Sequence, residues 1–77
     1  MQDLTENDAR ILAFEERGMR AGGRKDEAIR AELGISPARY YQRLNMLIDV
    51  PAAMAEYPSM TARLRRLRHR RAEERGS

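Results

Sequence analysis

The 77 residues suffice for one small domain, which at this size buries only about 60% of the surface that its unfolded chain exposes. No cysteine is present, and this excludes a disulfide framework and a thiolate metal site. Residues 1–38 carry 6 basic and 8 acidic side chains, whereas residues 39–77 carry 9 basic and 4 acidic side chains. The basic second half favours a polyanion partner over a merely arginine-rich solvated surface.

The chain is predicted to be helical, because no run of alternating β-branched residues indicates a strand. A first helix begins at Thr5, a favourable N-cap with Asp8 three residues later, as in a capping box. Its apolar side chains are Ile11, Leu12 and Phe14. The charged side chains expected on or near its other side are Glu15, Glu16 and Arg17. A turn is then favoured by Gly18, Gly22 and Gly23.

A second helix is predicted from about Arg24 or Lys25 to Leu33, and Gly34 ends it as a C-terminal glycine. Ser36 is a favourable N-cap for a third helix, and Pro37 suits its first position, where an N–H group has no helical partner. This third helix is predicted to run to about Asp49, before the Val50-Pro51 pair.

Two shorter predictions complete the chain. Residues 52–57 are compatible with a short helical turn, and Pro58 is well placed to open a last helix. The apolar stripe of this helix consists of Met60, Leu64 and Leu67. Because the stripe stops at Leu67, we expect the helix to leave the core there and to fray before Gly76.

The segment around Gly34 has the layout of a helix-turn-helix. A helix, a Gly-Ile-Ser turn and a capped helix follow one another, and Tyr40 lies six residues past the glycine. Arg30 departs from the usual pattern, which has a small residue four positions before the turn glycine. Either its side chain points outward or the helices cross differently. We therefore predict one all-α domain over residues 1–77, a three-helix helix-turn-helix bundle with a core at about 4–68 and a fourth, basic helix at about 58–75.

The third helix has an apolar face and a polar face when its residues are placed at about 100° each. The apolar face contains Tyr40, Leu44, Leu47 and Ile48. The residues predicted to contact a DNA groove are Ser36, Ala38, Arg39, Tyr41, Gln42 and Asn45. Glutamine and asparagine can pair bidentately with adenine. Asp49 would repel the DNA backbone, so only the first two turns are expected to approach it.

The last helix is rich in arginine, with six in the nine residues from Arg63 to Arg71. Such a surface binds phosphates without base specificity. The predicted phosphate contacts are Arg63, Arg65, Arg66 and Arg70. The alternative is a solvated helix end in which cations complement the helix dipole, with Glu73 and Glu74 pairing to His69 and Arg70.

Catalysis has little support in the sequence. His69 is the only histidine and lies among cations, where it is expected to be a polar surface residue. No glycine-rich phosphate loop and no nucleophile–base arrangement is present. We therefore predict a protein that is not an enzyme and that has no metal site and no cofactor.

Three segments, "LTENDARILAFE", "KDEAIRAELGISPARYYQRLNMLID" and "RLRRLRHRR", resemble a family of short actinobacterial proteins of unknown function. The resemblance covers about Leu4 to Arg71, and "RYYQxLNxLID" is its most specific part. Members are described as having a helix-turn-helix similar to the DNA-binding helices of sigma factors. The resemblance implies an intracellular DNA-binding protein of bacterial or phage origin, with a regulatory role and without catalytic residues.

The predicted function is binding to double-stranded DNA in transcription regulation, in the cytoplasm and associated with the nucleoid. No apolar run approaches the roughly 18 residues of a membrane span, and the acidic N-terminus is unlike a signal peptide, so no membrane partner is expected. The small core and single DNA-contacting helix suggest a homodimer, formed through surfaces around Phe14, Met54 or Met60.

Two other functions remain open. The chain could be a protein–protein adaptor that docks on RNA polymerase, a sigma factor or another regulator, and Met46 and Asp49 on the third helix suit that role. It could also bind DNA or RNA without sequence preference through the arginine helix alone. Dependence on salt separates these functions, because phosphate-driven binding weakens steeply as salt rises.

Overall fold

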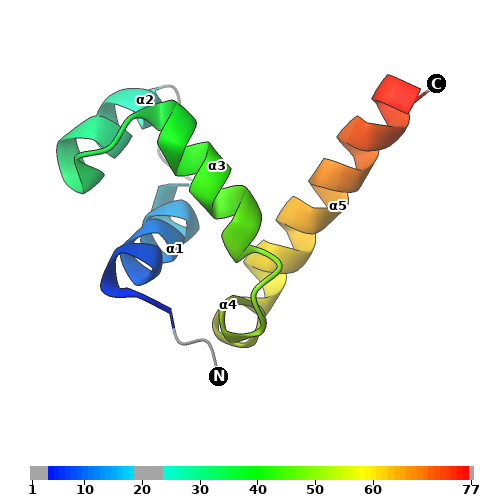
Figure 1. The fold of residues 1–77 in the computed structure, drawn as a ribbon, viewed down its shortest axis with the longest axis horizontal. Coiled ribbons are helices and arrows are strands. Elements are labelled where there is room, and N and C mark those ends of the chain that lie inside the picture. Colours follow the sequence, from blue (N-terminus) through cyan, green and yellow to red (C-terminus); the bar gives the residue numbers. More distant parts are fainter. Residues whose placement is uncertain (1–3, 19–23, 77) are drawn as a thin grey trace.

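The computed structural model describes residues 4–18 and 24–76, and every regular element in these two ranges is helical, as predicted. The helices follow one another in the order α1 (Glu6–Gly18), α2 (Lys25–Ala28), η2 (Ile29–Leu33), α3 (Pro37–Leu47), α4 (Pro51–Glu56) and α5 (Pro58–Gly76). The elements α1, α2, η2 and α3 form one cluster, while α4 connects the end of α3 to the long α5 (Figure 1). The predicted turn at Gly22 and Gly23 lies outside the described residues.

The start of α1 follows its sequence signal. The Thr5 hydroxyl accepts a hydrogen bond of 3.0 Å from the backbone N–H of Asp8, as expected for an N-cap. One hydrophobic core joins α1 to the other helices, and its buried members are Ile11, Leu12, Phe14, Ile29, Tyr40, Leu44, Leu47, Ile48, Ala53 and Met60. Because this core takes residues from α1, η2, α3, α4 and α5, it fixes the orientation of α3 from several sides.

The second predicted helix has the expected extent but an unexpected form. It begins as α2 and continues as the π-helix η2, in which each turn is wider than in an α-helix. Gly34 ends it with a φ of 69°, the left-handed conformation that favours glycine, and its N–H donates to the Arg30 oxygen. The Arg30 side chain is exposed, so the outward alternative for this residue is confirmed.

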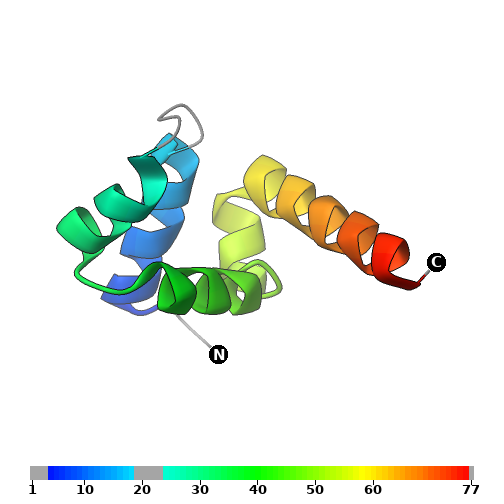
Figure 2. The same cartoon turned by 90° about the horizontal axis from the view of Figure 1, so that it is seen from above.

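The last helix projects from the rest of the molecule. Helix α5 packs on α4 and diverges from α3 (Figures 1 and 2). The radius of gyration is 12.9 Å, whereas a compact chain of this length would have about 11.5 Å. Leu67 is 38% exposed, which confirms that the helix leaves the core there. The predicted fraying is wrong, because α5 remains helical through Gly76.

Three other predictions about burial need correction. Glu15 is buried, although it was expected on the polar side of the first helix. Phe14 and Met60 are also buried, at 4% and 3% exposure, so neither can form an exposed dimer surface. Met54 is half-buried, and its sulfur accepts a hydrogen bond of 3.1 Å from Arg65. Within residues 4–18 and 24–76, no helix is both long and apolar enough to cross a membrane.

Candidate nucleic-acid interface

The turn before α3 determines where that helix begins. Ser36 has an extended backbone, and its hydroxyl accepts a hydrogen bond of 3.2 Å from the N–H of Arg39. Pro37 occupies the first turn, as predicted, where its fixed φ suits a helix and its missing N–H costs nothing. Gly34, two residues before Ser36, provides the change of direction. The N-terminal turn of α3 is therefore fixed by local contacts.

Tyr40 sets the rotation of α3 from the inside. Its side chain is fully buried, and its hydroxyl donates a hydrogen bond of 2.5 Å to the buried carboxylate of Glu15. Lys25 donates to the same oxygen at 2.7 Å, and the Tyr40 ring meets Phe14 edge-on at 5.5 Å. Burial, together with the hydrogen bond and charge of Glu15, raises the pKa of the Tyr40 hydroxyl, which therefore remains a proton donor. A turn of α3 about its axis would break this buried network.

A second ion pair fixes α3 one turn after Tyr40. The Arg43 guanidinium donates two hydrogen bonds, of 2.8 and 3.0 Å, to the two carboxylate oxygens of Asp8. The Asp8 side chain is only 7% exposed, whereas that of Arg43 is 45% exposed. The hydrogen bond from Arg43 holds the pKa of Asp8 below its ordinary value, although burial acts in the opposite direction. This pair ties the outer edge of α3 to the first turn of α1.

The six predicted groove contacts are all exposed, but they fall into two groups. Four of them, Ser36, Ala38, Arg39 and Gln42, line an open groove between α1 and α3. The other two are not part of its lining. Tyr41, which is 44% exposed, lies edge-on against Tyr40 and 5.3 Å from the Lys25 ammonium. Asn45 contacts α5.

Arg68 of α5 connects that helix to the end of α3. Its guanidinium donates to both carboxylate oxygens of Asp49, at 3.0 and 2.8 Å, and to the side-chain oxygen of Asn45 at 3.2 Å. The hydrogen bond from Arg68 lowers the pKa of Asp49. Arg65 adds a longer contact to Asp49, at 3.4 Å. The negative charge that was expected to repel DNA is therefore neutralised by two arginines.

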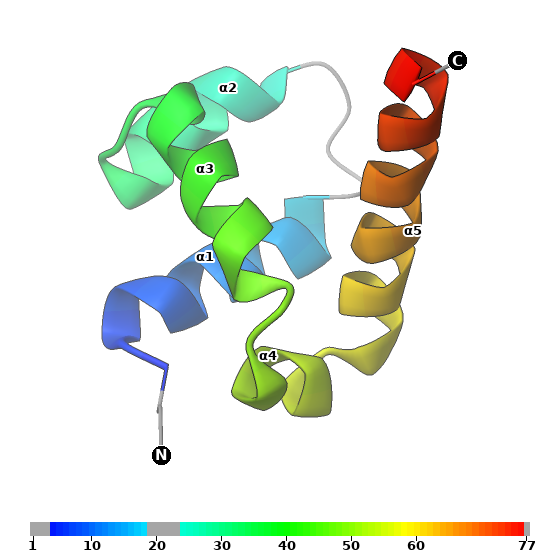
Figure 3. The ribbon, with the colours of Figure 1, turned by 45° about the vertical axis from the view of Figure 1, so that its right-hand side comes forward.

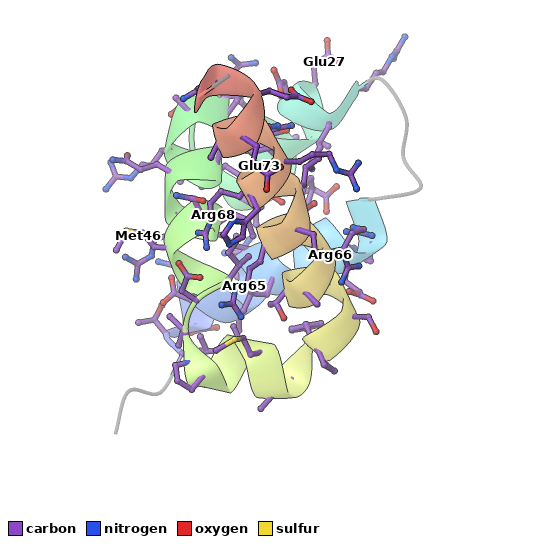
Figure 4. The ribbon with its side chains drawn as sticks, turned by 90° about the vertical axis from the view of Figure 1, so that its right-hand side faces the viewer. Glu27, Met46, Arg65, Arg66, Arg68 and Glu73 are labelled. Carbon is purple, nitrogen blue, oxygen red and sulfur yellow. The ribbon has the colours of Figure 1, made fainter. Side chains whose placement is uncertain are left out.

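The four predicted phosphate contacts are not equivalent. Arg65 is engaged with Asp49 and Met54, and Arg63 is half-buried. Arg66 and Arg70 are exposed and form no ion pair with any other described residue. Figure 4 shows Arg68 directed toward α3 and Arg66 on the other edge of α5. The arginine-rich helix thus has one edge bonded to the protein and one edge open.

The residues that hold the site in place could not be recognised in the sequence. Glu15 and Lys25 are 10 residues apart, Arg68 and Asp49 are 19 apart, and Arg43 and Asp8 are 35 apart. No local spacing rule joins residues at such separations. The one available signal was the position of two charged residues next to predicted core residues. Glu15 follows Phe14, and Arg43 precedes Leu44.

A family model matches residues 3–76 of the chain, and its description is "Protein of unknown function (DUF3263)". The chain belongs to this DUF3263 family. No curated protein and no solved structure matches the chain. The DUF3263 match extends over α1 to α5, so the projecting α5 belongs to the family domain together with the bundle.

Proposed function

We propose that the chain is a DNA-binding transcription regulator in which η2, the Gly34 turn and α3 act as a helix-turn-helix. The observation that carries the proposal is the outer face of α3, where small or hydrogen-bonding side chains are exposed on a helix of fixed rotation. With 11 residues, α3 is about 16 Å long, and an α-helix fits the major groove, which is about 12 Å wide. Gln42 and Arg39 are the exposed side chains suited to base edges.

Helix α5 supports the same function through its charge. It contains seven arginines and two glutamates, a net +5. Arg66 and Arg70 lie on its exposed surface without an acidic partner in the described ranges, and they would contact phosphates. Since α5 diverges from α3, it would contact the backbone beside the groove that α3 enters (Figure 3). Such contacts raise affinity for any sequence and leave base selection to α3.

Asn45 has a conditional role in this proposal. Bidentate pairing with adenine needs both its amide oxygen and its amide nitrogen. Arg68 already donates to the oxygen at 3.2 Å. Asn45 can therefore pair with adenine only after Arg68 turns from Asn45 to another acceptor, such as a backbone phosphate. Gln42 has no such contact with any other described residue and is the principal base-contacting residue of the proposal.

Selection of bound sequences from random duplex DNA tests the proposal, carried out with the full chain and with the Gln42→Ala, Asn45→Ala double variant. We expect a recurrent sequence with the native chain and a weaker or altered preference with the double variant. Affinity should fall linearly with the logarithm of salt concentration, with a slope of about −0.9 per phosphate contacted. Absence of binding to duplex DNA at low salt would overturn the proposal, and binding without any sequence preference would remove the role of α3.

A further inference from the structure

The groove between α1 and α3 has features that DNA binding leaves unused. It has a volume of about 690 Å³, within the range of about 300–1,000 Å³ typical of ligand sites. Beyond the four predicted DNA contacts, its lining includes apolar side chains from three elements of the fold: Ile11 of α1, Leu33 of η2, and Met46 of α3, with Ile35 in the turn. Duplex DNA presents mainly phosphates and sugars and has few groups that would fill an apolar hollow.

The exposure of Met46 is the observation that most strongly indicates a protein partner. Met46 is 58% exposed, more than any other large apolar side chain in the described ranges. Figure 4 shows it pointing away from α5, so α5 does not cover it. Methionine is flexible and polarizable, and it adapts to varied apolar surfaces. An apolar side chain placed in the groove would cover the exposed surface of Met46 and Ile35 and would lie over the buried Ile11.

The charge of the groove indicates what kind of partner would bring that side chain. The lining contains three arginines, Arg10, Arg39 and Arg43, and one acid, Asp8. Arg43 and Asp8 neutralise each other. Arg10 donates to the uncharged backbone oxygen of Glu32 and so keeps its positive charge, and Arg39 forms no ion pair with another described residue. Cations therefore remain on both walls, Arg10 on α1 and Arg39 on α3.

We infer that this groove is a docking site for an acidic peptide segment of a partner protein, with an apolar side chain seated against Ile11, Ile35 and Met46 and carboxylates paired with Arg10 and Arg39. This combination matches both the charge and the apolar lining. One consequence rests on the proposed function. Because the peptide would cover Arg39 and Gln42, peptide and duplex DNA should exclude each other.

The test begins with selection from a displayed library of random dodecapeptides against the immobilised full chain. Enriched sequences should combine Asp or Glu with Leu, Ile, Phe or Met and should lack Lys and Arg. The affinity of a selected peptide is then measured for the native chain and for two matched variants, Met46→Ser and Leu67→Ser. Both residues are exposed, so the two variants are expected to fold alike. Of the two, only Met46 lines the groove.

Met46→Ser should weaken peptide binding by tenfold or more, the effect of removing one buried apolar side chain, and Leu67→Ser should leave it unchanged. Absence of enriched peptides, or equal effects of the two variants, overturns the inference. Met46 is not a proposed DNA contact, so Met46→Ser should still bind duplex DNA. Peptide binding without any DNA binding would refute the proposed function and leave the groove assignment standing. Simultaneous binding of peptide and duplex would refute their mutual exclusion.

Discussion

The guanidinium of Arg68 in α5 donates hydrogen bonds to both the backbone oxygen and the side-chain oxygen of Asn45 in α3, at 3.3 and 3.2 Å. The same group binds Asp49, which lies just after the end of α3. Among the described residues, helix α5 packs most closely on the short α4, and Arg68 adds a polar connection between α5 and the end of α3 that contributes to the angle between the two helices. In the proposed function, that angle determines whether the two helices contact one DNA duplex together.

The first prediction concerns this connection. Arg68→Ala should broaden the distribution of distances between spin labels on α3 and α5, measured in the full chain. Arg71→Ala is the matched control, because Arg71 is exposed on α5 and pairs with no acid in the described part of the chain. The loss of stability should stay below about 1 kcal/mol, because both partners are more than a third exposed. Unchanged distances in Arg68→Ala would show that α4 alone sets the helix angle.

Local sequence signals correctly predicted where α1 starts, where η2 ends and where α3 starts. Thr5, Gly34 and Ser36 each act within four residues of their own position, through a side-chain cap or a left-handed backbone. For the same reason the exposed face of α3 follows from helical periodicity once Tyr40 is placed inside. These features depend on residues close in sequence, and they fix where the candidate site lies.

The remaining features depend on residues far apart in sequence. Glu15 is buried because Tyr40 and Lys25 supply its hydrogen bonds, and a charged residue in the first helix does not by itself indicate such partners. The bonds of Arg68 similarly require knowledge of how α4 places α5 beside the end of α3 (Figure 1). The π-helix η2 has no recognised local signal. The exposed face of α3 was therefore predictable, whereas the π-helical form of η2, the burial of Glu15 and the pairing of charges were not.

The second prediction tests the buried network around Glu15. Tyr40→Phe removes a hydroxyl that donates to a buried carboxylate, and this should lower the free energy of unfolding by about 2 kcal/mol, typical of hydrogen bonds to charged groups. Urea denaturation measures the change. Tyr41→Phe is the control, because Tyr41 is 44% exposed and its hydroxyl has no hydrogen bond within the described ranges; it should change stability little. Equal effects of both substitutions would contradict a structural role for the Glu15 contact.

The third prediction concerns the pH dependence of stability. The pKa of Asp8 is lower in the folded chain than its ordinary value of 3.8, mainly because Arg43 donates hydrogen bonds to the ionised form. The stabilisation is therefore fully present above the ordinary pKa and is lost as the pH falls through the folded pKa. Asp8→Asn should cost about 1 kcal/mol at neutral pH, an amount limited by the half-exposed Arg43.

Urea midpoints across the acidic range check this prediction. The difference between native chain and Asp8→Asn should shrink toward zero once Asp8 is protonated, because both side chains are then neutral. Asp49→Asn provides a comparison: the pKa of Asp49 is also lowered by an arginine, but its side chain is 50% exposed, so its effect at neutral pH should be smaller. A difference that persists undiminished at the lowest pH would refute the ionic origin of the effect.

The last prediction separates phosphate contact from base contact within the proposed function. Arg66→Ala with Arg70→Ala removes two exposed cations, and it should weaken binding to every duplex by a similar factor and make the salt slope shallower by about 2. Gln42→Ala removes a neutral side chain, so the salt slope of this variant should equal that of the native chain. Its preference for the selected sequence should decline. Fluorescence anisotropy on selected and scrambled duplexes over a range of salt concentrations measures both. If the arginine variant lost sequence preference instead, α5 rather than α3 would make the base contacts.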